Sequence, residues 1–222
     1  MKIKKVYDLT QELYHNCPGW PDFPPPIMVS MLYMGRDGCN VEKFVDINTH
    51  TATHVDAPYH WIPDGKTHDQ IPVETWIGEG VVVDMTHKKD KEAITDRDLE
   101  KGASHVQSGD IVMLYTGRDK YRGFNEKYLK NWPSIDKSGA EWVVKKNVKI
   151  IGTDGLGIEM YGFKEPLVHT TLLKAEIPII EELYLEEIAK MGEKRWLFIC
   201  LPLKIRGAGG AFARVIAIDE EK

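Results

Sequence analysis

Cysteine is scarce in this sequence, and its three cysteines stand far apart. Cys17, Cys39 and Cys200 form no CxxC pair. Disulfide frameworks and thiolate zinc sites need cysteines at short, regular spacings, so the sequence argues against both. At 222 residues the chain is long enough to bury a hydrophobic core without such crosslinks.

Long hydrophobic runs are missing as well. No apolar stretch approaches the roughly 20 residues that a membrane helix needs. The first residues, Met-Lys-Ile-Lys-Lys, lead straight into a strand-like segment without the apolar core of a secretory signal. We therefore expect a cytoplasmic protein that has no membrane partner.

A clustered basic surface, the usual mark of nucleic-acid binding, is also absent from the sequence. The net charge is −5 and is spread along the chain, and the lysines near the start form only a short solvated run. The hydrophobic fraction of 42% and the charged fraction of 28% are typical of soluble globular proteins. A small molecule is therefore the expected partner, rather than nucleic acid.

Strand-like segments outnumber helical ones, and the two alternate irregularly. The expected strands are residues 6–9, 41–47, 80–85, 110–116, 149–154, 196–203 and 212–218. The expected helices are residues 73–77, 95–101, 138–146 and 186–191, the third of them introduced by a capping box at Ser138 and Glu141. Residues 1–222 are thus expected to form one α/β domain with a mixed β-sheet and flanking helices.

Two loops contain residues of interest. Residues 15–26 hold five prolines and a glycine, so this loop is rigid, and Trp20 within it either fills a core gap or lines a pocket. Residues 61–71 also read as a loop, and we expect His68 to be a surface or loop residue there.

Three histidines and an aspartate fall within eleven residues: His50, His54, Asp56 and His60. In a straight strand the first and last of these would lie about 33 Å apart, whereas metal–ligand bonds are only about 2 Å long. A shared site therefore requires the backbone to curl, and Pro58 is a suitable place for the bend.

A lone histidine is usually structural, but this many costly polar groups around an Ala-Pro turn favour a metal or catalytic site. Histidine and carboxylate ligands without cysteine favour zinc, with manganese as the alternative. Such sites often keep an open position, where a divalent ion lowers the pKa of bound water to about 7 and so supplies hydroxide at neutral pH.

The histidine segment His50-x-Ala52-Thr53-His54-x-Asp56-Ala57-Pro58-x-His60 resembles the HxGTHxDxPxH signature of the cyclase-like metal-dependent hydrolases, which include kynurenine formamidase and isatin hydrolase. The resemblance extends along nearly the whole chain. It includes Trp20-Pro21, Gly109-Asp110-Ile111-Val112 with Tyr115-Thr116-Gly117, Gly152-Thr153-Asp154, His169-Thr170-Thr171-Leu172-Leu173 and Ile177-Pro178-Ile179-Ile180-Glu181.

The resemblance implies a swivelling β/β/α (cyclase-like) fold and a homodimer or tetramer. It implies that His50, His54 and Asp56 bind a first ion, and that Asp56 bridges to a second ion bound by His169 and Glu181. His60 would be the general acid/base and Trp20 would contact the substrate. The alternation of Ile177, Ile179 and Glu181 mildly supports Glu181 over its neighbour Glu182.

Two positions depart from the family pattern. Ala52 replaces the glycine of the signature, which would cost about 1 kcal/mol if the backbone there requires a positive φ. Gly157 stands where many members have a serine, so the shape of the pocket is expected to differ.

These features lead to a metal-dependent hydrolase that cleaves a small amide, either a formamide such as N-formylkynurenine or a cyclic amide. In this hypothesis His60 takes a proton from water and passes it to the leaving nitrogen. The alternatives are a lactonase or a cyclising dehydratase at the same metal site, or a non-catalytic metal- or ligand-binding protein.

Overall fold

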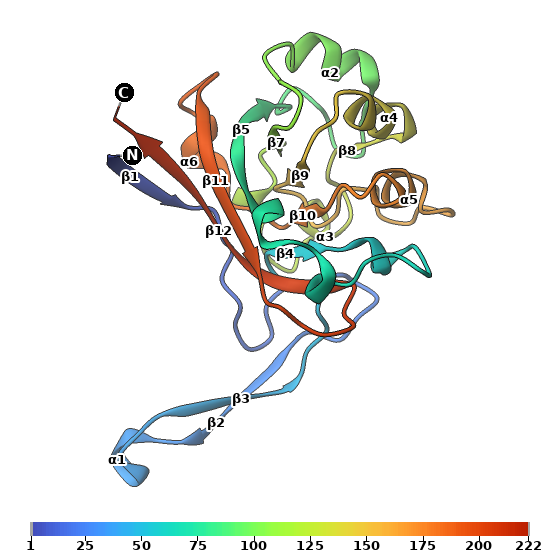
Figure 1. The fold of residues 1–222 in the computed structure, drawn as a ribbon. Coiled ribbons are helices and arrows are strands. Elements are labelled where there is room, and N and C mark those ends of the chain that lie inside the picture. The colour runs from blue at the N-terminus through green and yellow to red at the C-terminus, as the bar shows by residue number, and fades with distance from the viewer. Residues whose placement is uncertain (1, 222) are drawn as a thin grey trace.

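An eight-stranded mixed sheet forms the centre of the computed structural model, which describes residues 2–221 (Figure 1). The strand order is β1-β12-β11-β5-β7-β9-β10-β4. Its strands are β1 (Ile3–Asp8), β4 (His54–Asp56), β5 (Ile77–Asp84), β7 (Ile111–Tyr115), β9 (Ile150–Thr153), β10 (Ile179–Glu181), β11 (Arg195–Pro202) and β12 (Gly210–Glu220). Two further strands, β6 (Ala93–Ile94) and β8 (Ser134–Ile135), pair with each other.

The sheet curls because the short strand β4 has two neighbours. It pairs antiparallel with β10 and also with the first residues of the long strand β12. Strands β5, β7, β9 and β10 run parallel, whereas β1, β11 and β12 are antiparallel to their neighbours. The expected α/β class with a mixed sheet is confirmed.

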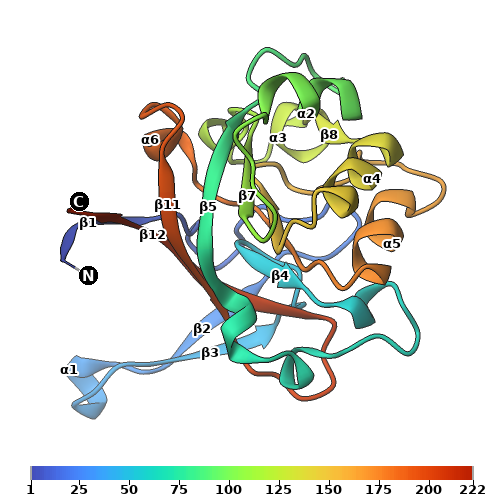
Figure 2. The same cartoon turned by 45° about the horizontal axis from the view of Figure 1, so that its top comes forward.

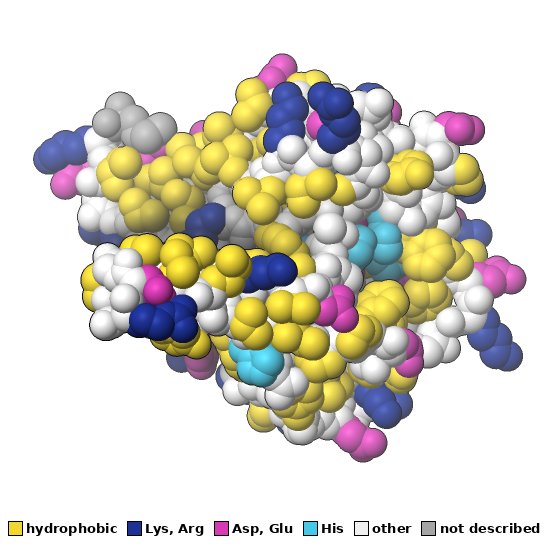
Figure 3. Space-filling model, turned by 90° about the horizontal axis from the view of Figure 1, so that it is seen from below, with side chains coloured by type: hydrophobic (Ala, Val, Ile, Leu, Met, Phe, Trp, Pro, Cys, Tyr) yellow, Lys and Arg dark blue, Asp and Glu magenta, His cyan; other side chains and the backbone are white. Residues whose placement is uncertain are grey.

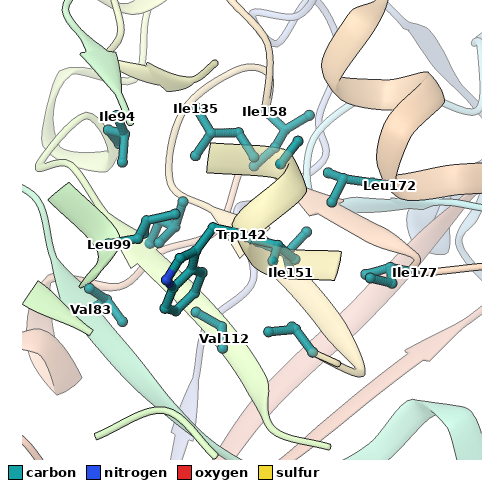
Figure 4. Packing of buried hydrophobic residues seen from close by; sticks show 14 of the residues in the cluster. Val83, Ile94, Leu99, Val112, Ile135, Trp142, Ile151, Ile158, Leu172 and Ile177 are labelled. Atoms are coloured by element: carbon teal, nitrogen blue, oxygen red, sulfur yellow. The ribbon is translucent and has the colours of Figure 1, made fainter. Parts of the chain in front are cut away.

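Three helices cover the outer face of the parallel strands (Figure 2). They are α2 (Asp96–Gly102), α4 (Lys137–Lys145) and α5 (Leu167–Lys174). Figure 4 shows how Trp142 of α4 lies among Leu99 of α2, Val112 of β7 and Ile151 of β9. The burial of these apolar side chains fixes α4 and α5 against the sheet, and so fixes the start of α5 beside the end of β10.

A second apolar core lies inside the curve of the sheet. Trp196 and Phe198 of β11 and Val215 of β12 are fully or almost fully buried there, together with Ile188 of α6 (Glu186–Ala189). The remaining short helices are α3 (Glu126–Leu129) and the 3-10 turns η1 (Pro58–His60), η2 (His68–Gln70), η3 (Val73–Trp76) and η4 (Asp119–Tyr121).

A two-stranded arm leaves the body of the molecule between residues 27 and 46 (Figure 1). It consists of β2 (Ile27–Leu32), the single turn α1 (Met34–Asp37) and β3 (Val41–Asp46). The expected strand at residues 41–47 is therefore present, but it pairs with β2 rather than joining the main sheet.

The structure corrects two expectations and adds one helix, α5, that the sequence did not predict. Helix α4 begins at Lys137 and is capped by Asp136, whose carboxylate accepts a hydrogen bond from the Gly139 N–H, so the capping box at Ser138 is wrong. His68 is buried and stacks on Trp76, so it is not a surface residue. Within residues 2–221 no helix combines the length and apolar character needed to cross a membrane.

Candidate metal centre

Strand β4 places His54 and Asp56 on one face, because side chains alternate along a strand. Its pairing with β10 sets Glu181 directly opposite His54. The expected grouping of these three residues follows from this register. Their reactive atoms lie close together: His54 Nε2 is 3.5 Å from Asp56 Oδ1 and 3.5 Å from Glu181 Oε2.

The backbone curls after β4, as the spacing of the histidines required. Pro58 begins the 3-10 turn η1, because its fixed φ suits the first position of a helical turn. This turn returns His60 to His50, and the two ring centroids are 4.0 Å apart. His50 Nδ1 is 2.8 Å from Asp56 Oδ1, so the start of the segment also lies against this carboxylate.

His169 enters the cluster from the first turns of α5. Its Nε2 atom is 3.7 Å from Asp56 Oδ2 and 3.5 Å from Glu181 Oε1. The five residues expected to bind metal therefore lie around a common centre, although they come from β4, α5, β10 and the loop before β4.

The cluster has polar atoms that the fold leaves without partners. Among the described residues, no hydrogen bond reaches His54 Nε2 or either oxygen of Asp56, and His50 is not aligned to supply one. Burying such groups unsatisfied is costly. Their donor atoms lie within 4.8 Å of one another in two sets, His50–Asp56–His60 and His54–Asp56–Glu181. This donor set fits a divalent ion, and Asp56 belongs to both sets.

Two contacts behind the cluster orient the imidazoles. His54 Nδ1 donates to the carbonyl oxygen of Ala52 at 2.8 Å, and His169 Nδ1 donates to Glu159 Oε2 at 2.7 Å. Each contact leaves Nε2 facing the centre, the arrangement that metal-binding histidines commonly adopt. Glu159 was not predicted from the sequence, because the only signal for it is an acidic residue ten positions before His169. Its Oε1 atom also accepts a hydrogen bond from the Val168 N–H at the start of α5.

The charges in the cluster are strongly coupled. Burial would raise the pKa of Asp56, but His60 and His50 outweigh it and hold the pKa far below its usual range. Burial lowers the pKa of His60 to about 4, so its imidazole is neutral at pH 7 and can accept a proton. Burial opposes the charge on His169, yet its contacts with Glu159 and Glu181 raise the pKa to about 10.

A cavity of about 210 Å³ opens directly on the cluster. Aromatic side chains form much of its wall: Trp20, Phe23, Trp61 and Phe163. Trp20 therefore lines a pocket, one of the two alternatives its loop left open, and it also packs edge-on against the buried Trp132. Such a cavity suits a flat, apolar group held next to the polar centre.

The neighbours Glu181 and Glu182 have different surroundings. Glu181 Oε1 faces His169 and accepts a hydrogen bond from the Ile158 N–H at 2.7 Å. Glu182 lines the cavity too, but its Oε2 atom accepts a hydrogen bond from the Tyr128 hydroxyl at 2.7 Å. The alternation that favoured Glu181 for the cluster agrees with this geometry.

Both departures from the family pattern have structural consequences. Ala52 has a φ of 53°, the left-handed region that favours glycine, so the strain expected at this position is present. At Gly157 an added Cβ would lie 3.3 Å from the Trp20 ring and 3.2 Å from Trp132. The absence of a side chain there thus allows the two indole rings to pack closely.

Comparisons with known proteins agree with the fold. A kynurenine formamidase from Bacillus cereus is 28% identical over 97% of this chain and 98% of its own length. A predicted metal-dependent hydrolase from Bacillus stearothermophilus superimposes with a TM-score of 0.80 at 29% identity, covering 97% of this chain and 98% of that one.

Isatin hydrolase A from Ralstonia solanacearum has the same fold, with a TM-score of 0.86 at 23% identity over 97% of this chain and 92% of that one. The family model named Cyclase matches residues 7–160, well over half of the sequence, and this confirms the resemblance seen in the histidine segment. The chain therefore belongs to the Cyclase family of metal-dependent hydrolases.

Proposed function

We propose that this chain hydrolyses small aromatic amides at the cluster around Asp56. The observation that carries the proposal is the buried carboxylate of Asp56, which accepts no hydrogen bond, next to His54 Nε2, which also has none, in a cluster whose histidines line an aromatic cavity. The enzyme class, a metal-dependent hydrolase acting on C–N bonds outside peptides, follows from the kynurenine formamidases and hydrolases related to this chain.

The metal ligands in this proposal are the residues of the cluster. His50, His54 and Asp56 would hold the first ion, and His169 and Glu181, together with Asp56, would hold a second one. Zinc suits the nitrogen and oxygen donors best, and manganese is the alternative. The bound ion would activate water and polarise the substrate carbonyl.

His60 is the proposed general acid/base. Its neutral imidazole lies beside His50 and lines the cavity, so it can take the proton of the attacking water. The same imidazole then protonates the leaving nitrogen. Trp20 and the other aromatic side chains of the wall hold the substrate ring against this centre.

A formamide such as N-formylkynurenine or a cyclic amide fits this chemistry. The formamide is suggested by the related kynurenine formamidases, and the cyclic amide is suggested by the similar fold of isatin hydrolase. Lactones present a similar carbonyl to the same centre and are the alternative substrates. The protein is further proposed to act in the cytoplasm as a homo-oligomer.

The role of His60 can be separated from a ligand role by one substitution. His60→Ala should lower kcat by a factor of about 10²–10⁴, because the proton transfer is lost, and leave the metal content unchanged. Amide hydrolysis and metal content would be measured together, with the exposed His87→Ala as control. Full hydrolytic rate at full metal content would refute the role, and loss of metal would make His60 a ligand instead.

A further inference from the structure

One acidic side chain in the wall of the cavity is not among the residues of the metal cluster. Glu182 follows Glu181 directly after β10, and its Oε2 atom accepts a hydrogen bond from the hydroxyl of Tyr128 in α3. The residue is only 1% exposed, yet it lines the cavity. Glutamate is rarely buried to this degree, because removing a carboxylate from water is costly. The position of Glu182 therefore needs an explanation beyond the cluster.

The backbone holds Glu182 in an unusual conformation. Its φ is 56°, in the left-handed region that disfavours residues with a side chain. Its N–H donates to the Gly155 carbonyl at 3.0 Å, and its carbonyl accepts from the Thr53 hydroxyl at 2.5 Å. These contacts on both sides fix the direction in which the side chain leaves the backbone. Strain that the surrounding structure maintains in this way is often found at binding sites.

The contacts of the Glu182 carboxylate leave part of its acceptor capacity unused. The Tyr128 hydroxyl lies 2.7 Å from Oε2, and the backbone N–H of Ala52 contributes a further contact. Arg122 Nε is 3.8 Å from Oε2, which is too far for a hydrogen bond. Because a carboxylate can accept about four hydrogen bonds, a donor that enters the cavity can still bind Glu182.

The cavity wall favours a positively charged group over a negative one. Its lining contains no Lys or Arg among the described residues, and its acids are Glu181, which belongs to the cluster, and Glu182. Figure 3 shows histidine side chains in a recess beside hydrophobic ones, and the Lys and Arg side chains visible in this view stand apart from them. The faces of Trp20 and Trp61 would also attract a cation.

We propose that Glu182 is a specificity-determining residue, which accepts a hydrogen bond from an amino substituent on the aromatic ring of the substrate. This inference rests on the proposed function, because it concerns the same cavity. A hydrogen bond between an ammonium group and a carboxylate is stronger than one between neutral groups. The preferred substrate is therefore an aromatic amide that carries a basic amino substituent, and an amide with a carboxylate in its place is disfavoured.

Binding of substituted anilines tests this inference without any hydrolysis. The anilines carry an aminomethyl, methyl or carboxylate group, in one ortho and one meta series, and titration calorimetry measures their affinity for the zinc-loaded protein. In at least one series the aminomethyl compound should bind at least about tenfold more tightly than the methyl compound, because it gains a charge-assisted hydrogen bond. The carboxylate compound should bind most weakly. Absence of this order in both series would overturn the proposal.

Glu182→Gln separates the carboxylate from the shape of the cavity. The new amide can still accept from the Tyr128 hydroxyl, so the fold should survive, which circular dichroism would verify. This variant should lose most of the preference for the aminomethyl compound. Asp22→Asn is the matched control, because Asp22 is an exposed acid that accepts a hydrogen bond from Trp20 Nε1, and it should keep the preference. An undiminished preference in Glu182→Gln, or an equal loss in both variants, would overturn the proposal.

Hydrolysis of the corresponding formanilides distinguishes this inference from the proposed function. Where these amides are hydrolysed, their kcat/KM values should follow the same order as the affinities, and Glu182→Gln should level that order. A binding preference without hydrolysis of any amide would refute the proposed function and leave Glu182 as the selecting residue. Values of kcat/KM that do not depend on the substituent would refute the role of Glu182 and leave the hydrolase intact.

Discussion

At the scale of single residues, the site depends on how the histidines are held from behind. Glu159 accepts from His169 Nδ1 and so directs Nε2 toward Asp56 and Glu181. Groups that orient a ligand in this way usually affect metal affinity, although they do not touch the ion. This role makes Glu159 the residue whose replacement best separates orientation from direct binding.

Glu159→Gln should weaken metal binding about 10–100-fold, because the neutral amide orients and polarises His169 less strongly. Metal affinity would be measured by competition with a chelator. Glu165→Gln makes the same replacement at an exposed glutamate of the same loop. It is the matched control and should leave the metal affinity unchanged. Equal affinities for the two variants would exclude the orienting role.

The positive φ of Ala52 gives a second test at this scale. Ala52→Gly should leave the free energy of unfolding equal to or above that of the unchanged protein, because relief of about 1 kcal/mol of strain offsets the lost methyl group. Ala57→Gly, equally buried but with a φ of −90°, should cost about 1–2 kcal/mol. Urea unfolding of both metal-free variants would compare them, and equal losses would contradict the strain.

The short spacing of the histidine segment made His50, His54, Asp56 and His60 predictable from the sequence alone. His169 and Glu181 came only from the family resemblance, because they reach the cluster through the packing of α5 and the pairing of β10 with β4. Glu159 lies in an irregular loop, where no periodic pattern indicates which way a side chain points.

At the scale of secondary structure, elements with clear local signals were predictable. The apolar runs of β5, β7 and β9 and the caps of α2 appear in the sequence much as in the structure. Helix α5 was missed because it begins after Pro166 with no side-chain cap. The arm was missed in part because β2 follows the proline-rich loop, has no polar alternation and is mostly exposed.

Helix α2 illustrates how charge stabilises one such element. Asp98 accepts hydrogen bonds from the Thr95 hydroxyl and from Lys88 Nζ, both at 2.7 Å. Partial burial opposes the charged form, but these contacts outweigh it and lower the pKa of Asp98 from 3.8 to about 2. A carboxylate with a lowered pKa stabilises the fold above its unfolded pKa, and that contribution is lost as the pH falls toward 2.

Asp98→Asn should therefore reduce the free energy of unfolding by about 1–2 kcal/mol at pH 7, because the cap and the ion pair are weakened. The difference from the unchanged protein should shrink as the pH falls from about 4 toward 2. Urea unfolding across this pH range would measure it, with the exposed Glu141→Gln as control. A difference that does not depend on pH would contradict the ionic contribution.

At the scale of the whole molecule, the fold brings distant segments to one point. The pairing of β4 with both β10 and β12 places the histidine segment where the curved sheet closes, and the proline-rich loop supplies Trp20 and Phe23 to the aromatic wall. The class of fold could be predicted from alternating apolar segments. The closure of the sheet by β4 could not be predicted, because this three-residue strand is too short to show a hydrophobic pattern.

The measurement that tests the account most directly is hydrolysis by chelator-stripped protein before and after addition of zinc or manganese. N-Formylkynurenine and a cyclic aromatic amide would be followed by ultraviolet absorbance, with Asp56→Asn as the matched variant. We predict that stripped protein is inactive, that metal restores turnover of at least one amide, and that the variant stays inactive with little bound metal. Full turnover by stripped protein, or failure of the unchanged protein to bind metal, would contradict the assignment of the cluster.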